Sequence, residues 1–287
     1  MYSLRSLCLI LLLMASQVTC SSALAIESFA TIPIKTTGPT GATVQAEMPV
    51  TVFQPIGQGP FPAVILSHGR PALLLRQTMG RVKLSSVATA FLGEGFVVIV
   101  PTRIGYGMAK GPDVEDSVSC EEPRYSDTFA ASADQIAAAA AFARTLPYVD
   151  PERLLLVGHS MGGAGTIAAG VRNLPGVRAV ISFNGGQGAR LSNPGEPCRP
   201  DVLLKTFAAL GKVKSPVPQL WIHTENDRQF SAAHARSWFS AFSEAGGTGE
   251  LKVFPAYRDD GHLWFQNEPI AWLSTVRTFT AANGLRQ

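Results

Sequence analysis

The sequence carries little net charge. Its 24 lysine and arginine residues and 21 aspartate and glutamate residues give a formal charge of only +3 across 287 residues, and the cations are scattered rather than grouped in a stripe. Proteins that bind nucleic acids usually concentrate basic residues on one surface, so we expect no nucleic-acid partner. The hydrophobic content of 46% instead predicts a folded domain with a large core.

Long hydrophobic runs are missing after the N-terminus. No later segment has the roughly twenty uninterrupted apolar residues that a membrane-spanning helix needs, so we expect no integral membrane anchor. At the N-terminus, Arg5 precedes the short apolar run 7–15, and the Ala-Leu-Ala sequence at 23–25 forms a small-x-small cleavage pattern. These features predict a signal peptide over residues 1–25 and export to a periplasm or outside the cell. A lipid anchor at Cys20 is the weaker alternative, because the residues before it do not fit that pattern.

Cysteine is scarce, and Cys8 and Cys20 would leave with the signal peptide. The remaining two, Cys120 and Cys198, would more often pair than stay free in an oxidising compartment. Such a disulfide would close a long loop and contribute about 4 kcal/mol of stability. Two unpaired thiols are the alternative. Neither cysteine has another cysteine or a histidine at ligand spacing, so the sequence indicates no metal site.

Strands and helices alternate from residue 62 to the C-terminus with short connections. The expected strands cover residues 62–67, 96–100, 154–157, 177–183, 218–223 and 251–254. The expected helices cover residues 84–92, 127–146, 166–171, 201–210, 232–244 and 268–282, and Ser126 or Asp127 can cap the second of them. This alternation predicts a mostly parallel central sheet with helices on both faces, and the pattern of residues 26–53 adds antiparallel edge strands. We predict one α/β domain over residues 26–287.

The pentapeptide Gly158-His159-Ser160-Met161-Gly162 stands between an expected buried strand and an expected helix. In this context a Gly-x-Ser-x-Gly turn presents the serine hydroxyl as a nucleophile, because the flanking glycines permit a turn too tight for larger side chains. We therefore predict that Ser160 is a nucleophile. The alternative is a glycine-rich turn with an incidental serine.

A serine nucleophile needs a base and usually an acid that orients the base. Among five histidines, His262 is the candidate base because it lies in a flexible loop after the expected strand 251–254. Asp227, which follows the expected strand 218–223, is the candidate acid, with Glu225 in reserve. A helix-capping role for Asp227 and an exposed loop position for His262 are the alternatives. The order Ser160, Asp227, His262 is the order found in α/β hydrolases.

An oxyanion formed at Ser160 needs backbone donors. The Met161 N–H opens the helix after the serine, and the Arg70 N–H is the available donor in the loop after residue 67, because Pro71 has none. The segments 112–125 and 184–200 are expected to line or cover the pocket. The candidate apolar contacts in that pocket are Tyr106, Trp264 and Phe265, for which ordinary core packing is the alternative.

The residues quoted above resemble those of α/β hydrolases, in particular the dienelactone-hydrolase-like and polyester-esterase-like branches. The resemblance covers residues 49–281 and rests on the His68-Gly69 pair, the serine pentapeptide with Gly163, Asp227 and the Gly261-His262 pair. It implies the fold, a serine-hydrolase mechanism and these site positions. Dienelactone hydrolases proper carry cysteine at the position of Ser160, so their substrate is not carried over. The triple-glycine oxyanion motif of many lipases is also absent after His68.

The sequence thus predicts an exported serine hydrolase that cleaves carboxylic esters through an acyl-enzyme on Ser160. Its expected partner is a small-molecule ester, and the mechanism needs no metal or organic cofactor. A serine peptidase or amidase of the same fold is one alternative. A non-catalytic binding protein is the other, because a fold alone does not establish an activity.

Overall fold

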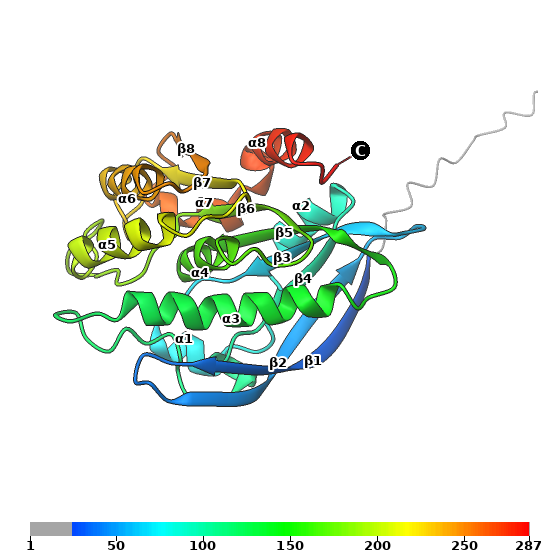
Figure 1. Ribbon diagram of the computed structural model, residues 1–287, viewed down its shortest axis with the longest axis horizontal. Coiled ribbons are helices and arrows are strands. Elements are labelled where there is room, and N and C mark those ends of the chain that lie inside the picture. Colours follow the sequence, from blue (N-terminus) through cyan, green and yellow to red (C-terminus); the bar gives the residue numbers. More distant parts are fainter. Residues whose placement is uncertain (1–24, 287) are drawn as a thin grey trace, which may run out of the picture.

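The central sheet has eight strands in the order β1-β2-β4-β3-β5-β6-β7-β8 (Figure 1). The computed structural model describes residues 25–286, so residues 1–24 of the predicted signal peptide lie outside the described part of the chain. The strands are β1 (Ile26–Thr37), β2 (Thr43–Gln54), β3 (Phe61–Ser67), β4 (Val97–Pro101), β5 (Val149–His159), β6 (Val177–Phe183), β7 (Gln219–Thr224) and β8 (Gly249–Phe254). The β1–β2 and β2–β4 pairs are antiparallel and the other neighbours are parallel. The predicted sheet with antiparallel N-terminal edge strands is confirmed.

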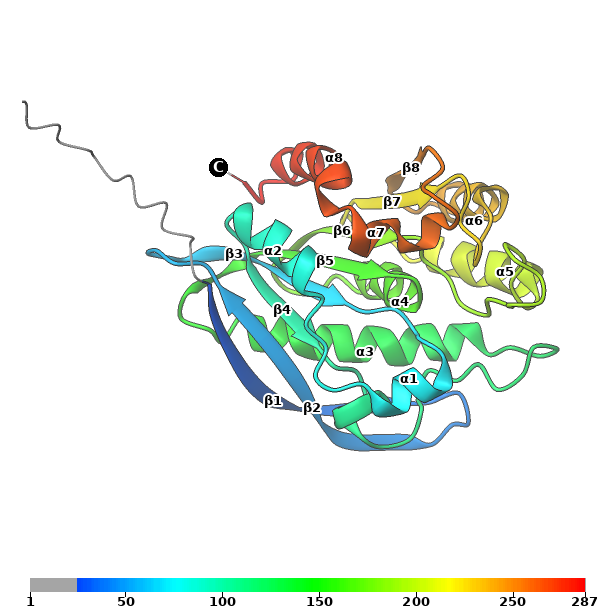
Figure 2. The same cartoon turned by 180° about the vertical axis from the view of Figure 1, so that it is seen from behind.

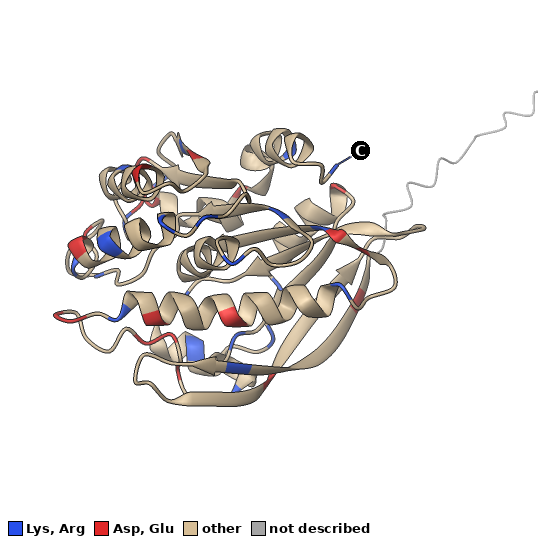
Figure 3. Ribbon diagram, viewed as in Figure 1, with Lys and Arg blue, Asp and Glu red and all other residues tan. Residues whose placement is uncertain are grey.

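Helices cover both faces of this sheet. They are α1 (Leu73–Thr78), α2 (Ser85–Gly93), α3 (Tyr125–Ala143), α4 (Met161–Gly170), α5 (Pro200–Gly211), α6 (Ala232–Glu244), α7 (Trp264–Asn267) and α8 (Pro269–Ala282), with short 3₁₀ turns η1 (Gly107–Ala109) and η2 (Gly261–Leu263). Figure 2 shows the sheet from the side that carries α2, α7 and α8. The charged residues of both signs are interspersed along these elements (Figure 3).

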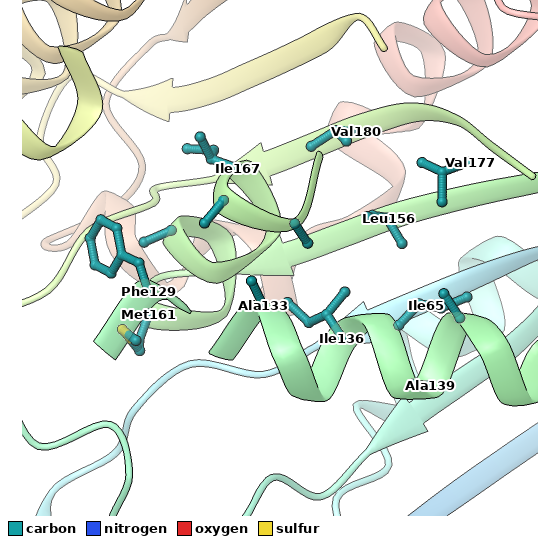
Figure 4. Packing of buried hydrophobic residues seen from close by; sticks show 14 of the residues in the cluster. Ile65, Phe129, Ala133, Ile136, Ala139, Leu156, Met161, Ile167, Val177 and Val180 are labelled. Atoms are coloured by element: carbon teal, nitrogen blue, oxygen red, sulfur yellow. The ribbon is translucent and has the colours of Figure 1, made fainter. Parts of the chain in front are cut away.

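Alternate residues of the central strand β5 supply two separate cores, since successive side chains of a strand point to opposite faces. Leu154 and Leu156 belong to the core under α3, α4, α5 and α6, and Figure 4 shows Leu156 near Ile136 of α3. Leu155 and Val157 belong to the second core, under α2, α7 and α8. Burial on both faces explains why the central strands read as uninterrupted apolar runs.

Helix α3 begins two residues earlier than the sequence predicts. Its N-terminal cap is Arg124, and neither Ser126 nor Asp127 caps it, so that prediction is wrong. Asp127 instead lies in the first turn and accepts a hydrogen bond from Arg124 Nε at 3.0 Å. Tyr125 extends the helix because its side chain is buried and its hydroxyl donates to the Cys198 carbonyl at 2.6 Å. A distant loop therefore sets this helix end.

A disulfide joins Cys120 to Cys198, with the two Cα atoms 5.0 Å apart and 78 residues of separation along the chain. It ties the segment before α3 to the loop before α5, as the cysteine count suggested. Among residues 25–286, no helix combines the length and the apolar composition needed to cross a membrane.

Candidate active site

Ser160 occupies the sharp turn between β5 and α4. Its backbone angles are φ 57° and ψ −124°, a conformation that side-chain-bearing residues rarely adopt. The flanking glycines allow it, because a Cβ on Gly158 would overlap the Gly162 carbonyl, and a Cβ on Gly162 would overlap the carbonyls of Ser67 and His68. The strained turn is typical of a serine nucleophile at the carboxyl end of a strand.

Backbone hydrogen bonds fix this turn in the sheet. The Ser160 N–H donates to the Phe183 carbonyl at 2.9 Å, and the Gly186 N–H donates to the Ser160 carbonyl at 3.2 Å. Within the described residues, the Ser160 hydroxyl makes no side-chain hydrogen bond, and it lines a cavity of about 580 Å³. The hydroxyl is therefore open to a ligand that enters this cavity.

His262 and Asp227 form a hydrogen-bonded pair. His262 lies in η2, after β8, and its Nδ1–H donates to the two carboxylate oxygens of Asp227 at 2.9 and 3.1 Å. The Asp227 carboxylate also accepts the N–H groups of Gln229 at 2.7 Å and Phe230 at 3.0 Å, and the Asn184 side-chain amide at 2.6 Å. This leaves His262 Nε2 as the ring nitrogen that can take a proton.

The Asp227 side chain is fully buried yet stays ionised. Burial raises the pKa of a carboxyl group, but the facing His262, then His223 and the Phe230 N–H outweigh that effect. The pKa of Asp227 therefore lies well below its usual range. The reserve candidate, Glu225, is half exposed and pairs with Arg236 at 2.7 Å on the surface.

Two further histidines, His159 and His223, contact this pair. The His159 Nε2–H donates to the His262 carbonyl at 2.9 Å, and its ring stacks on Phe265 at 5.2 Å between centroids. Burial, and then the neighbouring His262, lower the pKa of His159 to about 3, so this ring is neutral. His223 lies 3.5 Å from an Asp227 oxygen and donates to the Phe230 carbonyl at 2.6 Å. The sequence predicts neither the contact of His159 with His262 nor that of His223 with Asp227.

The two predicted oxyanion donors lie beside the serine. Met161 and Arg70 both line the cavity with Ser160. Met161 is the first residue of α4, where backbone N–H groups have no partner within the helix. The Arg70 N–H makes no hydrogen bond among residues 25–286. Gly69 brings this loop close, because a Cβ there would lie 3.2 Å from the Ser160 Cβ.

The cavity walls come from several loops. They comprise residues 70–72, 116–117, 186–191, 194 and 228–230, with Asp260. The predicted segments 112–125 and 184–200 thus both reach the cavity. Asp260 also accepts the His262 N–H at 2.9 Å and the Arg228 N–H at 3.1 Å, so it fixes the loop that carries the histidine.

None of the three aromatic residues predicted for the pocket belongs to its lining. Trp264 and Phe265 are buried in the core under α2 and α8, where Phe265 packs on Phe183 and Trp272. Tyr106 is fully buried, and its hydroxyl donates to Glu115 at 2.5 Å. Packing, which was the alternative for each, accounts for all three.

An ionic cluster that the sequence does not predict lies behind the loop 67–70, here called the oxyanion loop. Arg103 and Glu115 are fully buried, and the Arg103 Nε lies 2.6 Å from a Glu115 oxygen. Arg70 pairs with Asp113 at 2.5 Å, and Arg76 lies 3.1 Å from the same carboxylate. Across the described residues, histidine, cysteine and acidic side chains do not gather into a group that could hold a metal ion.

Comparison with known proteins gives one family. The profile of the "Dienelactone hydrolase family" matches residues 50–276. A search of curated proteins finds no match.

Solved structures share the fold at low sequence identity. An esterase from Pyrococcus furiosus has a TM-score of 0.56 and 16% identity over 89% of this chain and 91% of its own. A putative dipeptidyl aminopeptidase IV from Bacteroides ovatus has a TM-score of 0.62 at 16% identity, and a puromycin-hydrolysing peptidase from Mycobacterium tuberculosis has 0.59 at 18%, each over 90% of this chain. This chain spans only 36% and 40% of those two peptidases. The similarity to these three solved structures indicates an α/β-hydrolase fold.

Proposed function

Because the chain belongs to the dienelactone hydrolase family, we propose that it is a serine hydrolase that cleaves carboxylic esters through an acyl-enzyme on Ser160. The observation that supports this most is the buried His262–Asp227 hydrogen bond at 2.9 Å, which joins the loops after β7 and β8 at the sheet edge that also carries the strained serine. Asp227 holds the imidazole with Nδ1 protonated, so Nε2 has the lone pair that a general base requires.

The reaction follows from these roles. His262 Nε2 takes the hydroxyl proton as Ser160 Oγ bonds to the ester carbonyl carbon, and the N–H groups of Met161 and Arg70 stabilise the oxyanion. The tetrahedral intermediate collapses, the C–O bond to the alcohol breaks, and His262 gives its proton to the departing alcohol. Water then attacks the acyl-enzyme with His262 again as base, which releases the acid and restores the serine hydroxyl.

An ester substrate is preferred over a peptide because the chain belongs to the dienelactone hydrolase family, and a lactone is a cyclic ester. The similarity to an esterase from Pyrococcus furiosus agrees with this choice. A peptidase or amidase of the same fold is the second candidate, because the fold neighbours include peptidases. A non-catalytic binding protein is disfavoured by the buried hydrogen bond between Asp227 and His262.

We also propose that the protein is exported. A disulfide between Cys120 and Cys198 suits an oxidising compartment, and the N-terminal pattern of charge and apolar residues suits a signal peptide. N-terminal sequencing of the protein purified from its native host tests this. A mature chain that starts near Ile26 is expected, and a chain that retains Met1 contradicts export by this route.

A fluorophosphonate probe tests the nucleophile. The native protein should label at Ser160, Ser160→Ala should not, and the matched control Ser86→Ala, on a surface serine outside the cavity, should label as the native protein does. Absence of labelling, or labelling of Ser160→Ala, contradicts the proposed function. Esters of graded acyl length, assayed beside a peptide amide, then decide between esterase and peptidase.

A further inference from the structure

The fully buried ion pair between Arg103 and Glu115 lies directly behind the loop that carries Arg70. Arg103 follows β4, and Glu115 lies in the segment between η1 and α3. The guanidinium meets the carboxylate through two parallel hydrogen bonds, Nε to Oε1 at 2.6 Å and Nη2 to Oε2 at 3.0 Å. Burial raises the pKa of a carboxyl group, but the opposing charge of Arg103 keeps the pKa of Glu115 below its ordinary value. The pair is therefore charged.

Arg103 also donates hydrogen bonds to the last residue of β3 and to the residue after it. Its Nη1 donates to the Ser67 hydroxyl at 2.8 Å and to the His68 carbonyl at 2.6 Å. Its backbone N–H donates to His68 Nε2 at 3.2 Å. One arginine thus fixes a side chain, a carbonyl and a ring in two consecutive residues of the loop.

The loop beyond His68 is fixed by the same cluster. Since His68 Nε2 accepts from Arg103, its Nδ1 carries the proton and donates to the Gly69 carbonyl at 2.8 Å. The His68 ring packs edge-on against Tyr106 at 4.6 Å, and Tyr106 donates to Glu115. Every residue from 67 to 69 is therefore tied to the ion pair, directly or through one intermediate.

Arg70, the predicted oxyanion donor, is the next residue of this loop. Its guanidinium forms two hydrogen bonds with Asp113 at 2.7 and 2.5 Å, and its Nη1 lies 3.4 Å from the Tyr106 hydroxyl. Both terminal nitrogens of the Arg70 guanidinium are thus engaged, while the backbone N–H has no hydrogen-bond partner among the described residues.

We propose that Arg103 and Glu115 are positioning residues that hold the loop 67–70 so that the Arg70 N–H points at the oxyanion. The inference rests on the proposed function. Stability alone does not explain the pair, because the desolvation of two buried charges commonly cancels their attraction. A positioning role does explain the ion pair, because a backbone donor stabilises the transition state best when its direction is fixed before the substrate binds.

The test compares Glu115→Gln with the double variant R103M/E115L. Glu115→Gln keeps the shape and removes the charge that holds Arg103. The double variant removes both charges and keeps apolar volume, so it can fold even if the single variant does not. The matched control is Glu94→Gln, on a nearly buried carboxylate that pairs with Arg277 at 2.6 Å and does not line the cavity. The measurements are kcat and KM on an activated ester, the Ki of a trifluoromethyl ketone that forms a tetrahedral adduct, and the unfolding midpoint.

For each folded test variant we expect kcat to fall about tenfold to a hundredfold, a fraction of the effect of deleting an oxyanion donor. The Ki of the trifluoromethyl ketone should rise by a similar factor, while KM changes less than about threefold. Glu94→Gln should keep native kcat and Ki.

The inference is overturned if a folded test variant keeps kcat and Ki within about twofold of the native values, or if activity falls only in proportion to the unfolded fraction. If neither test variant folds, the pair serves folding and the positioning role is rejected. A native protein that hydrolyses no ester and takes no fluorophosphonate contradicts the proposed function instead, so the two failures are distinguishable.

Discussion

Asp227 and Arg70 follow strands on opposite sides of β5, and different interactions hold them. The carboxylate of Asp227 accepts N–H groups from residues only two and three positions later, Gln229 and Phe230. The Arg70 loop is held instead by side chains from residues 33 to 45 positions away, Arg103, Asp113 and Glu115. The acid–base side, Asp227 and His262, is thus built from local backbone contacts together with the distant but uncharged Asn184 amide. The oxyanion side, the loop 67–70, is built from distant charges.

This difference determines how each side responds to change. Backbone donors next to Asp227 persist when a distant residue is altered, so the acid and the histidine should tolerate variation elsewhere. The oxyanion loop depends on buried charges, and removal of one partner leaves an uncompensated charge in the core. A substitution on the oxyanion side should therefore disturb the other contacts of the ionic cluster, whereas a substitution on the acid–base side should disturb only its own contacts.

The largest effect is expected when the acid–base side is altered alone. Asp227→Asn keeps the shape of the side chain but removes the charge that orients His262 with Nδ1 protonated. We expect kcat to fall about 10⁴-fold, as for the equivalent change in other serine hydrolases, which is a larger loss than for Glu115→Gln. Ester hydrolysis measured together with the unfolding midpoint checks this. A loss below about tenfold in a folded variant would show that another acid orients the base.

The same contrast explains which parts of the site can be predicted from the sequence. The alternation of apolar strands with helices predicts the sheet, because each central strand is buried on both faces. The Ser160 turn and the choice of Asp227 and His262 depend on short motifs and on strand order, and both can be read along the chain. Their local backbone donors belong to the same stretch of sequence.

The oxyanion side could not be predicted in this way. Arg103 and Glu115 look like ordinary loop residues, and only the folded chain shows that they face each other. The sequence does not predict helix α1, because this helix buries a charged residue and exposes an apolar one. Its buried side chain is Arg76, which pairs with Asp113, while Leu74 is 72% exposed. The sequence places Tyr106 in the pocket, because nothing in it indicates that the hydroxyl reaches Glu115. Pairing between distant polar residues leaves no periodic signal in one sequence.

The next largest effect should come from the disulfide, which belongs to the oxyanion side through the segment 113–125. We expect the double variant C120S/C198S to lose up to about 4 kcal/mol of unfolding free energy, because its open chain gains conformational freedom. The KM should rise more than kcat falls, since the disulfide joins two segments that form the cavity walls and does not contact His262. Urea unfolding and steady-state kinetics measure both.

Reduction of the native protein provides the control for that pair of substitutions. If reduced native protein and C120S/C198S agree, the missing bond and not the new serines causes the change. An unchanged unfolding midpoint in both would contradict a stabilising role for the bond.

The effect of pH on His159, on the acid–base side, is small near pH 6.5 and grows as the pH drops. An unfolded histidine titrates near pH 6.5, whereas burial and His262 lower the pKa of His159 to about 3 in the folded protein. Between these values the unfolded chain binds more protons, so stability falls as the pH drops. This residue contributes at most about 1.4 kcal/mol per pH unit. His159→Gln should flatten the curve of unfolding free energy against pH between 6.5 and 3, and an unchanged slope would rule out this contribution.

The smallest effect is expected at Glu225, the other acid at the end of β7. Its carboxylate is half exposed and its partner, Arg236, is 2.7 Å away on the surface, an arrangement that usually contributes less than about 1 kcal/mol. Glu225→Gln should leave kcat within about twofold of native and shift the unfolding free energy by less than about 0.5 kcal/mol. If Glu225→Gln instead loses as much activity as Asp227→Asn, then both acids orient His262, and the acid–base side would depend on a more distant charge much as the oxyanion side does.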